Sequence, residues 1–403
     1  MNQPCRLHPH LPSLILRSKV PAALLLFTLL LTGSARADAP DTSSTLSSKV
    51  DSAVTAAVQW LEKQQANDGR WPSETYGSLK SGIGTTALIL EALSEVRPAK
   101  SSSAEAAFLR GQKVLTSNMK LSGVMHSPDG RSDSPVYASA LLLTASTRFR
   151  PLPEKEHGLL QRVLHQAQQI PRQSWPENAV GRGGWGIETD PATAESNPAN
   201  MSVTAHALTA LNLTDGLSAE PRKEAMAFLN RCRNPDFQPN GGFWFLPRRD
   251  DQLNKLGFSV DAQGEPQPRA YSTATCDGII ALLQLGKSVS DPDVVQALEF
   301  LLRQDPVAVP RMPENPDDPV PPLAGLYFYH AAALGSVWEQ TGDLRLQPRI
   351  KQIHNELLAL QKEDGRWESP IAIMREDDPL IATGLAIIAL KRFQSEPKTA
   401  DSR

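Results

Sequence analysis

The sequence repeats one signature, Gln65-Ala66-Asn67-Asp68-Gly69-Arg70-Trp71, which returns near the other end as Gln361-Lys362-Glu363-Asp364-Gly365-Arg366-Trp367. Both copies read Gln-x-x-x-Gly-x-Trp, and both follow an amphipathic stretch. In the first copy that stretch is 51–65, where apolar residues recur at the spacing of one helical face. The Asn and Gly inside the signature are typical of helix ends. A repeated signature of this kind predicts a repeat architecture.

The same helix-loop-helix pattern returns between the two copies with weaker signatures. Each unit pairs an amphipathic helix with one that is apolar on nearly every side, as expected of a helix buried all round. No stretch alternates apolar and polar residues like a strand, so we predict an all-α fold. The expected helices, two in each of six units, are 51–65, 84–93, 104–115, 136–146, 157–169, 202–211, 223–232, 272–285, 292–303, 329–339, 350–360 and 381–390.

The first and last units carry the best-formed signatures, so neither is predicted to be a polar capping repeat. An open array normally needs such caps, whereas a closed ring does not. We therefore predict an (α/α)6 toroid, with six apolar helices inside and six amphipathic helices outside. An open solenoid is the less favoured alternative. The predicted toroid domain covers 50–392, preceded by a Ser/Thr-rich lead-in at 38–49 and followed by a polar tail at 393–403.

The repeated signature resembles the QW repeat of squalene and hopene cyclases and, in weaker form, of protein prenyltransferase β subunits. The resemblance covers about 50–392, and it implies an α/α toroid of the terpenoid cyclase type. In that family the Gln and Trp brace the end of an outer helix against its neighbour. The resemblance therefore implies structural braces, in the degenerate copies as well, at Gln65, Gly69, Trp71, Gln361, Gly365, Trp367, Trp185 and Trp244.

Residues 1–37 have the features of an export signal. A basic start precedes a short apolar segment, and Ala35-Arg36-Ala37 fits an A-x-A cleavage site. We therefore expect a secreted or periplasmic protein with no integral membrane segment once the signal is removed. The whole chain has a net charge of −3, from 41 basic and 44 acidic residues. This balance argues against a nucleic-acid partner, which would need a basic face.

Candidate functional residues lie where the predicted inner helices begin. Inner helices of a toroid run parallel, so their N-termini converge on one mouth that favours anions. The ionisable candidates for catalysis are Asp277, Asp377, Asp378, His330 and His206. The aromatic candidates for ligand binding are Tyr137, Tyr271, Tyr327 and Tyr329. Asp277 stands out, because an ionisable group in an apolar helix must be paired or functional. A hydrogen bond to a helix end or to an arginine is the structural alternative.

The sequence lacks two catalytic motifs of the family that it resembles. The D-x-D-D acid of proton-initiated cyclases is absent. Cys276, Asp277 and His330 have the residue types of the prenyltransferase zinc site, but Cys276 and Asp277 are adjacent and in reversed order. Adjacent helical residues point about 100° apart, which disfavours one shared metal. We therefore expect no metal and no cofactor. Cys232 and Cys276 are more readily explained as free thiols than as a disulfide.

Three functions agree with these features. The first is an exported toroid that binds an apolar, isoprenoid-like or lipid-like small molecule, with an altered terpene-cyclase-like activity if it is an enzyme. The second is a non-catalytic scaffold for a protein partner, suggested by the long Pro-rich loop at 306–322. The third is an exported polysaccharide lyase or hydrolase on an (α/α)6 barrel, which would need a pair of carboxyl groups or a basic residue in an open cleft.

Overall fold

The computed structural model describes residues 42–214, 216–233, 241–248, 254–260, 263–303, 305–313 and 318–396. The chain divides at Thr42, and the account below concerns the unit that follows, Ser43–Arg403. The export signal predicted at 1–37 lies outside the described residues, and so do the start of the lead-in and most of the polar tail. Export therefore stays a prediction.

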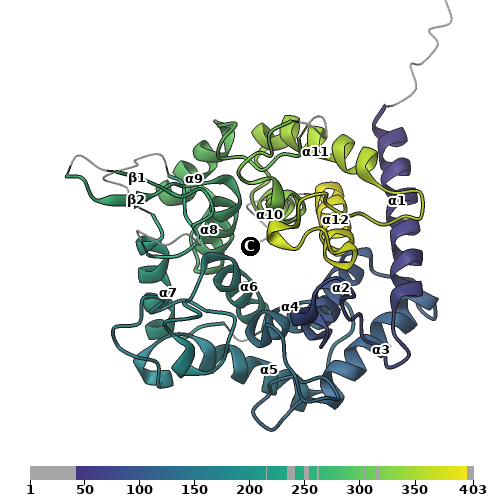
Figure 1. Cartoon of the computed structure of the whole chain (residues 1–403), viewed down its shortest axis with the longest axis horizontal. Coiled ribbons are helices and arrows are strands. Elements are labelled where there is room, and N and C mark those ends of the chain that lie inside the picture. Colours follow the sequence, from purple (N-terminus) through teal and green to yellow (C-terminus); the bar gives the residue numbers. More distant parts are fainter. Residues whose placement is uncertain are drawn as a thin grey trace, which may run out of the picture. The chain divides into compact units, whose positions relative to one another are not determined.

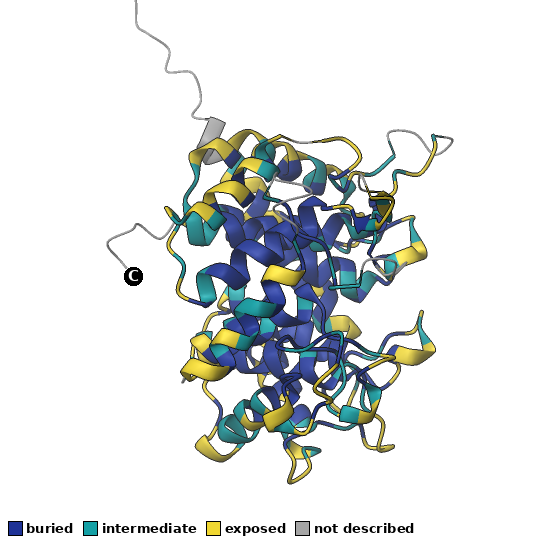
Figure 2. Ribbon diagram, turned by 90° about the vertical axis from the view of Figure 1, so that its left-hand side faces the viewer, coloured by how far each residue is buried: buried dark blue, intermediate teal, exposed yellow. Residues whose placement is uncertain are grey.

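Six inner helices form the centre of this unit (Figure 1). They are almost entirely buried because their residues are apolar or small on every side, as Figure 2 shows in dark blue. Neighbouring inner helices pack in chain order, and the last packs against the first, which closes the ring. The inner helices are α2 (Ile83–Val96), α4 (Pro135–Arg148), α6 (Met201–Asn212), α8 (Ser272–Gln284), α10 (Tyr327–Thr341) and α12 (Pro379–Gln394).

Six outer helices surround the ring, and each buries one apolar stripe while its other face is exposed. They are α1 (Thr42–Gln64), α3 (Ser103–Ser117), α5 (Glu154–Ala167), α7 (Ala219–Arg231), α9 (Pro292–Leu302) and α11 (Gln347–Leu360). Short 3₁₀ turns occupy the connections at Gly77–Leu79, Pro171–Gln173, Pro191–Thr193, Ala324–Leu326, Leu344–Leu346 and Ala372–Met374. The predicted all-α toroid of six helix pairs is confirmed.

The structure differs from the expected element plan in two places. Helix α1 begins at Thr42, inside the predicted Ser/Thr-rich lead-in, and Val50 on this helix is fully buried. A short antiparallel hairpin, β1 (Phe258–Val260) with β2 (Pro266–Pro268), lies between α7 and α8. It was not expected, because two three-residue strands are too short to produce a visible alternation.

The signature residues join successive outer helices. Gln65 donates from Nε2 to the carbonyl oxygens of Gly69, at 2.8 Å, and of Ala107 in α3, at 2.9 Å. Gln361 makes the same pair of bonds, to Gly365 at 2.9 Å and to Ala53 in α1 at 2.8 Å. Because Gln361 belongs to the last unit and Ala53 to the first, this bond crosses the point where the ring closes.

The tryptophan rings connect the two layers. The Trp71 indole N–H donates to the Leu61 carbonyl at 2.7 Å, and the Trp71 backbone N–H donates to Thr86 Oγ1 in α2 at 2.9 Å. Trp185 and Trp367 make the equivalent bonds to Leu164 and Thr204, and to Leu357 and Thr383. Each ring is fully buried.

In the fourth unit this position belongs to Phe243 and not to Trp244. The Phe243 backbone N–H donates to Thr275 Oγ1 at 3.0 Å, as Trp71 does to Thr86, and the Phe243 ring is fully buried. Trp244 lies one residue further on, and its indole N–H has no partner within the described part of the chain. The physical reason is the spacing from Gly241, which takes the place of Gly69 with a φ of +78°. The brace residue follows that glycine by two positions.

Candidate functional site

The starts of all six inner helices line one cavity of about 310 Å³, here called the N-terminal cavity. Because every inner helix contributes its first turns to it, the six helices run parallel and their N-termini converge there. Most of the wall is apolar, and it combines inner-helix residues with residues from the connecting loops. The apolar lining residues are Leu79, Leu88, Ile187, Val203, Phe245, Leu326, Met374, Ile381 and Leu385.

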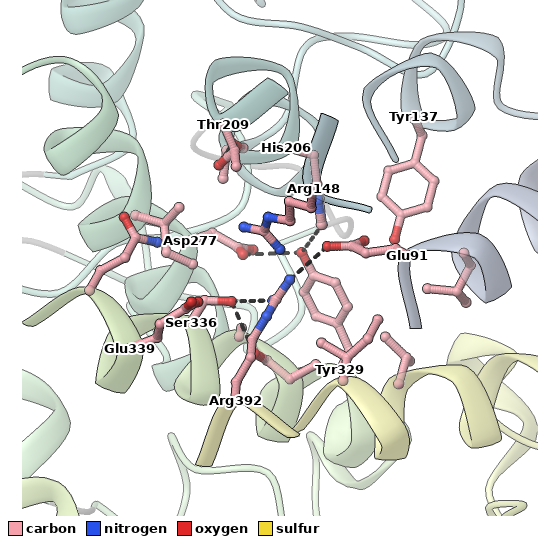
Figure 3. A pocket seen from close by; sticks show the side chains of 18 residues that line it. Glu91, Tyr137, Arg148, His206, Thr209, Asp277, Tyr329, Ser336, Glu339 and Arg392 are labelled. Atoms are coloured by element: carbon pink, nitrogen blue, oxygen red, sulfur yellow. Dashed lines mark hydrogen bonds and ion pairs between the residues drawn. The ribbon is translucent and has the colours of Figure 1, made fainter. Parts of the chain in front are cut away.

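A second and smaller space of about 40 Å³, the C-terminal cavity, is lined by the later turns of the same helices (Figure 3). Its wall is charged. Arg392 forms ion pairs with Glu91, at 2.7 Å, and with Glu95, at 2.8 Å, and Arg148 pairs with Glu95 at 2.5 Å. Arg392 also donates to Ser336 in α10. This network therefore joins α2, α4, α10 and α12 below the N-terminal cavity.

Five residues line both cavities and form the partition between them. They are Leu88, Tyr137, Asp277, Tyr329 and Leu385. Asp277 and Tyr329 are the polar centre of this partition, and Figure 3 shows their side chains facing each other. The Tyr329 hydroxyl donates to Asp277 Oδ1 at 3.0 Å. The partition therefore presents one carboxyl group to the floor of the apolar cavity.

The Asp277 carboxyl group is held in its neutral form. Its residue is only 3% exposed, and burial raises its pKa to about 8, although the hydrogen bond from Tyr329 lowers it. Burial disfavours the charged form because the apolar wall cannot solvate a carboxylate. A neutral carboxyl group can donate a hydrogen bond or a proton, as a carboxylate cannot. Asp277 is thus equipped to donate to a polar atom of a bound molecule.

A small polar network supports Tyr329. Its hydroxyl lies 2.6 Å from Ser202 Oγ and 3.5 Å from His206 Nε2, so the contact with Ser202 is the stronger hydrogen bond. Burial lowers the pKa of His206, which keeps its imidazole neutral. The ring of Tyr137 meets the His206 ring edge-on, with 4.9 Å between centroids. Residues from α4, α6, α8 and α10 therefore fix the Tyr329 hydroxyl beside Asp277.

Glu376 is a second buried carboxyl group in the N-terminal cavity. Its carboxyl oxygens accept the backbone N–H groups of Phe328, at 2.9 Å, and Tyr329, at 2.7 Å. Burial raises its pKa to about 8, and these backbone bonds lower it. Glu376 thereby caps α10, and both of its carboxyl oxygens are already engaged in these hydrogen bonds. Sequence reasoning missed this role because the cap comes from a loop of the next unit.

The structure brings together only part of the predicted set of site residues. Asp277, Tyr137 and Tyr329 lie in the partition, His206 lines the C-terminal cavity, and Tyr271 lines the N-terminal cavity. Glu91, Arg148 and Arg392 were not predicted. Charged residues inside otherwise apolar helices are the signal that could have indicated them.

The other four predicted residues do not line either cavity. Asp378 caps α12 by accepting the Leu380 N–H at 2.9 Å, and Asp377 accepts from the Tyr76 hydroxyl at 2.5 Å. Tyr327 points outward and donates to Glu356 in α11 at 2.6 Å.

His330 also lies on the outer side of α10, and burial lowers its pKa to about 3. The reason is rotational: residues 327 and 330 lie on another side of α10 from residue 329, since each residue turns by about 100°.

Metal-ligating groups do not gather anywhere in the part of the chain that the structure describes, where no three His, Cys, Asp or Glu side chains could hold one ion. Cys232 and Cys276 are buried free thiols. No helix among the described residues is long and apolar enough to cross a membrane.

No family model matches the sequence, and no curated protein matches it either. The structure is similar to that of the type II terpene cyclase MstE from Scytonema. Identity is 13%, the match covers 86% of this chain and 98% of that one, and the TM-score is 0.57. It is also similar to the GH76A alpha-1,6-mannanase from Salegentibacter sp. HEL1_6, at 12% identity over 87% and 98% of the two chains, with a TM-score of 0.56.

A protein from Actinoplanes matches as well, at 16% identity over 86% of this chain and 100% of that chain, with a TM-score of 0.52. At these identities the comparisons define the class of fold, an α/α toroid of the kind found in terpene cyclases. The fold expected from the repeated signature is thus confirmed. A terpene cyclase and an alpha-1,6-mannanase are both among the similar structures.

Proposed function

We propose that this is an exported toroid that binds an apolar small molecule, isoprenoid-like or lipid-like, in the N-terminal cavity. The observation that carries the proposal is the largely apolar cavity of about 310 Å³ with a neutral, buried carboxyl group on its floor. Such a lining with few polar groups is typical of small-molecule sites. The bound molecule would place a hydrogen-bond acceptor against Asp277.

Solved structures of the same fold support an apolar ligand. The MstE structures include complexes with geranylgeranyl dihydroxybenzoate as substrate and with merosterolic acid A as product. A cyclase-like reaction in this chain is a more specific hypothesis than ligand binding. A carboxyl group whose pKa is near 8 is a weak acid, so Asp277 is better suited to donate a hydrogen bond than to protonate an alkene. We therefore propose binding as the primary function.

The alternative of polysaccharide hydrolysis needs two carboxyl groups that face one open cleft. Among the described residues that line the N-terminal cavity, the carboxylic acids are Asp277 and Glu376. Glu376 is engaged by two backbone N–H groups of α10. This arrangement favours binding over hydrolysis. A non-catalytic scaffold remains the alternative if the cavity holds no ligand.

One experiment tests the proposal. The chain is expressed with its own N-terminus and purified from the exported fraction, and the N-terminus and any co-purifying molecule are read by mass spectrometry. The affinity for the fluorescent apolar probe N-phenyl-1-naphthylamine is then measured. Ile381 lines the cavity, so Ile381→Trp takes up part of its volume and is expected to lower probe affinity about tenfold.

Ile373→Trp is the matched control, because Ile373 is 72% exposed and is not among the lining residues. It should bind the probe as the unaltered chain does. Equal binding by the two variants, or no probe binding by the unaltered chain, would refute the cavity proposal. Recovery of the chain inside the cell with an uncleaved N-terminus would refute the predicted export and leave the cavity proposal standing.

A further inference from the structure

The helical wall of the N-terminal cavity differs from one side of the ring to the other. Helices α2 and α12 are neighbours, and they lie across the ring from α6 and α8 (Figure 1). On the side of α2 and α12 the lining residues include Leu88, Ile381 and Leu385. Thr85 of α2 also belongs to this wall, but its hydroxyl donates to the Trp71 carbonyl oxygen. These two helices therefore present hydrocarbon to a bound molecule.

The wall on the opposite side, at α8, presents hydrogen-bonding groups. Tyr271, Thr273 and Asp277 all line the cavity there. The Tyr271 hydroxyl makes no hydrogen bond with a described residue, and the buried Thr273 hydroxyl has no described partner either. The Asp277 carboxyl group accepts from Tyr329 through Oδ1, and its Oδ2 has no partner in the part of the chain that the structure describes. Three polar side chains at α8 can therefore bond to a ligand.

Helix α6 continues this polar wall. Asn200, the residue before α6, accepts the Val203 N–H through Oδ1 at 3.0 Å, and its amide nitrogen donates to no residue that the structure describes. Ser202 lines the cavity as well, with its Oγ 2.6 Å from the Tyr329 hydroxyl, and Val203 adds apolar surface. An amide nitrogen donates, whereas a hydroxyl group can donate or accept. The wall at α6 and α8 is thus suited to hydroxyl and carbonyl oxygens.

A hydrocarbon surface against this wall would be unfavourable. It would exclude water from Tyr271, Thr273 and Asp277 without giving them a hydrogen bond, and such desolvation costs free energy. Thr273 and Asp277 are four residues apart, so they lie on the same face of α8 with about 5–6 Å between their β-carbons. Two oxygen atoms at a similar spacing along one edge of a rigid ligand would match both residues.

We propose that the ligand is a two-faced molecule, with uncharged hydroxyl or carbonyl oxygens along one edge and hydrocarbon along the other. Its oxygen-bearing edge lies against α6 and α8, and its hydrocarbon edge lies against α2 and α12. This inference rests on the proposed function, and it specifies the chemical class and the orientation of the molecule that the cavity accepts. A molecule with oxygens on both edges would bind more weakly, because one of them would be desolvated against Leu88, Ile381 and Leu385 without a partner.

Two isomers of one rigid diol test the inference. Decalin-2,7-diol is used as the isomer with both hydroxyl groups on one face of the ring system and as the isomer with one hydroxyl group on each face. Each is titrated at pH 7 by displacement of N-phenyl-1-naphthylamine. The two isomers have the same composition and differ only in the placement of the oxygens. We expect the same-face isomer to bind about tenfold more tightly than the opposite-face isomer.

Variants that remove one hydroxyl group at nearly constant shape locate the polar wall. Tyr271→Phe and Thr273→Val should each lower the affinity for the same-face diol about threefold to tenfold and leave the affinity for N-phenyl-1-naphthylamine unchanged. Tyr327→Phe is the matched control. The Tyr327 hydroxyl donates to Glu356 in α11 and lies outside the cavity lining, so this variant should change neither affinity.

The possible failures of this experiment are distinguishable. Equal affinity for the two diols in the unaltered chain, or no binding of either diol when N-phenyl-1-naphthylamine does bind, would overturn the two-faced ligand and leave the cavity proposal standing. An unchanged preference for the same-face isomer in both Tyr271→Phe and Thr273→Val would overturn the assignment of the oxygen-bearing edge to α8. Failure of N-phenyl-1-naphthylamine and both diols to bind would overturn the proposed function itself.

Discussion

Asp277 illustrates how one residue acquires its chemistry from its surroundings. In the sequence it is an acid within an apolar helix. In the fold it is buried at the centre of a partition, with Tyr329 as a hydrogen-bond donor at 3.0 Å. One hydrogen bond does not replace the solvation that a carboxylate loses, so burial raises its pKa to about 8. The neutral acid is therefore a consequence of tertiary packing.

The raised pKa predicts how stability depends on pH. The pKa of Asp277 is about 8 in the fold, whereas its ordinary value is 3.8. Its contribution to the free energy of unfolding is therefore fully present below about pH 4. Stability is then lost as the pH rises toward 8. Asp277→Asn cannot ionise, so the unaltered chain should lose up to about 1.4 kcal/mol per pH unit relative to this variant. Urea unfolding at pH 5, 6, 7 and 8 measures the difference.

Asp129→Asn is the control for this measurement. Asp129 is exposed, and the hydrogen bond from Ser127 lowers its pKa, so it is ionised in both states above pH 5. The free energy of unfolding of this variant, plotted against pH, should run parallel to that of the unaltered chain. If the Asp277→Asn curve were parallel as well, Asp277 would be ionised in the folded protein.

At the scale of the elements, outer helices end in loops that touch the next outer helix at a glycine. Gly69, Gly123, Gly183, Gly241 and Gly365 all have φ between +78° and +97°. A β-carbon at these positions would collide with a backbone carbonyl oxygen of the neighbouring helix, which is that of Glu224 in the case of Gly183. Both the left-handed backbone and the close approach therefore require glycine.

The destabilisation that this close contact would cause in an alanine variant can be measured separately from the destabilisation caused by backbone strain. Gly183→Ala should destabilise the protein by about 1–3 kcal/mol more than Gly130→Ala, since overpacking against fixed backbone costs about that much beyond the strained φ. Gly130 has a φ of +81°, but a β-carbon there would meet no atom within 4 Å, so this variant reports strain alone. Thermal and urea unfolding of the two variants measure the difference. Equal losses would show that the helices can move apart.

At the scale of the whole molecule, contacts of two kinds join the first and last helix pairs. Gln361 connects the last unit to α1, and Arg392 of α12 pairs with Glu91 and Glu95 of α2. The Arg392 side chain is 8% exposed, and its loss would remove the ion pair of Glu91 and leave Glu95 paired with Arg148 alone. The ring therefore depends on a buried ion pair at its closure.

We predict that Arg392→Met destabilises the protein by about 3–5 kcal/mol, the range typical of breaking a buried pair. Arg345→Met is the control. The Arg345 side chain is 52% exposed and pairs with Asp343 and Glu299 at the surface, so its loss should cost at most about 1 kcal/mol. Urea unfolding compares the two variants. A small loss for Arg392→Met would mean that the helices close the ring without this pair.

Much of the fold could be predicted because its signals are local. Helical periodicity identified all six helix pairs, and the matching signatures at Gln65 and Gln361 indicated a closed ring. Residue type misled at Trp244, because the spacing from Gly241, two positions before Phe243, gives the brace position to Phe243. The short hairpin of β1 and β2 was missed for a similar reason, since three-residue strands carry too little pattern.

The candidate site could be predicted only in part, because membership in a cavity depends on rotation about a helix axis. Tyr329 and Asp277 face the centre, whereas Tyr327 and His330 on the same helix as Tyr329 face outward. Glu376 and Arg392 act on helices that are neighbours only in space. No local pattern encodes such contacts, since they join residues from different units.

The sequence by itself determined the repeat, the two helical layers and the closure of the ring. These properties follow from periodicity, from helix-ending residues and from the repeated signature, all of which are read within a few positions of the chain. Only the tertiary structure decided which side chains share the N-terminal cavity and that Asp277 is neutral there. The physical reason is that solvation and charge at one point depend on all six inner helices together.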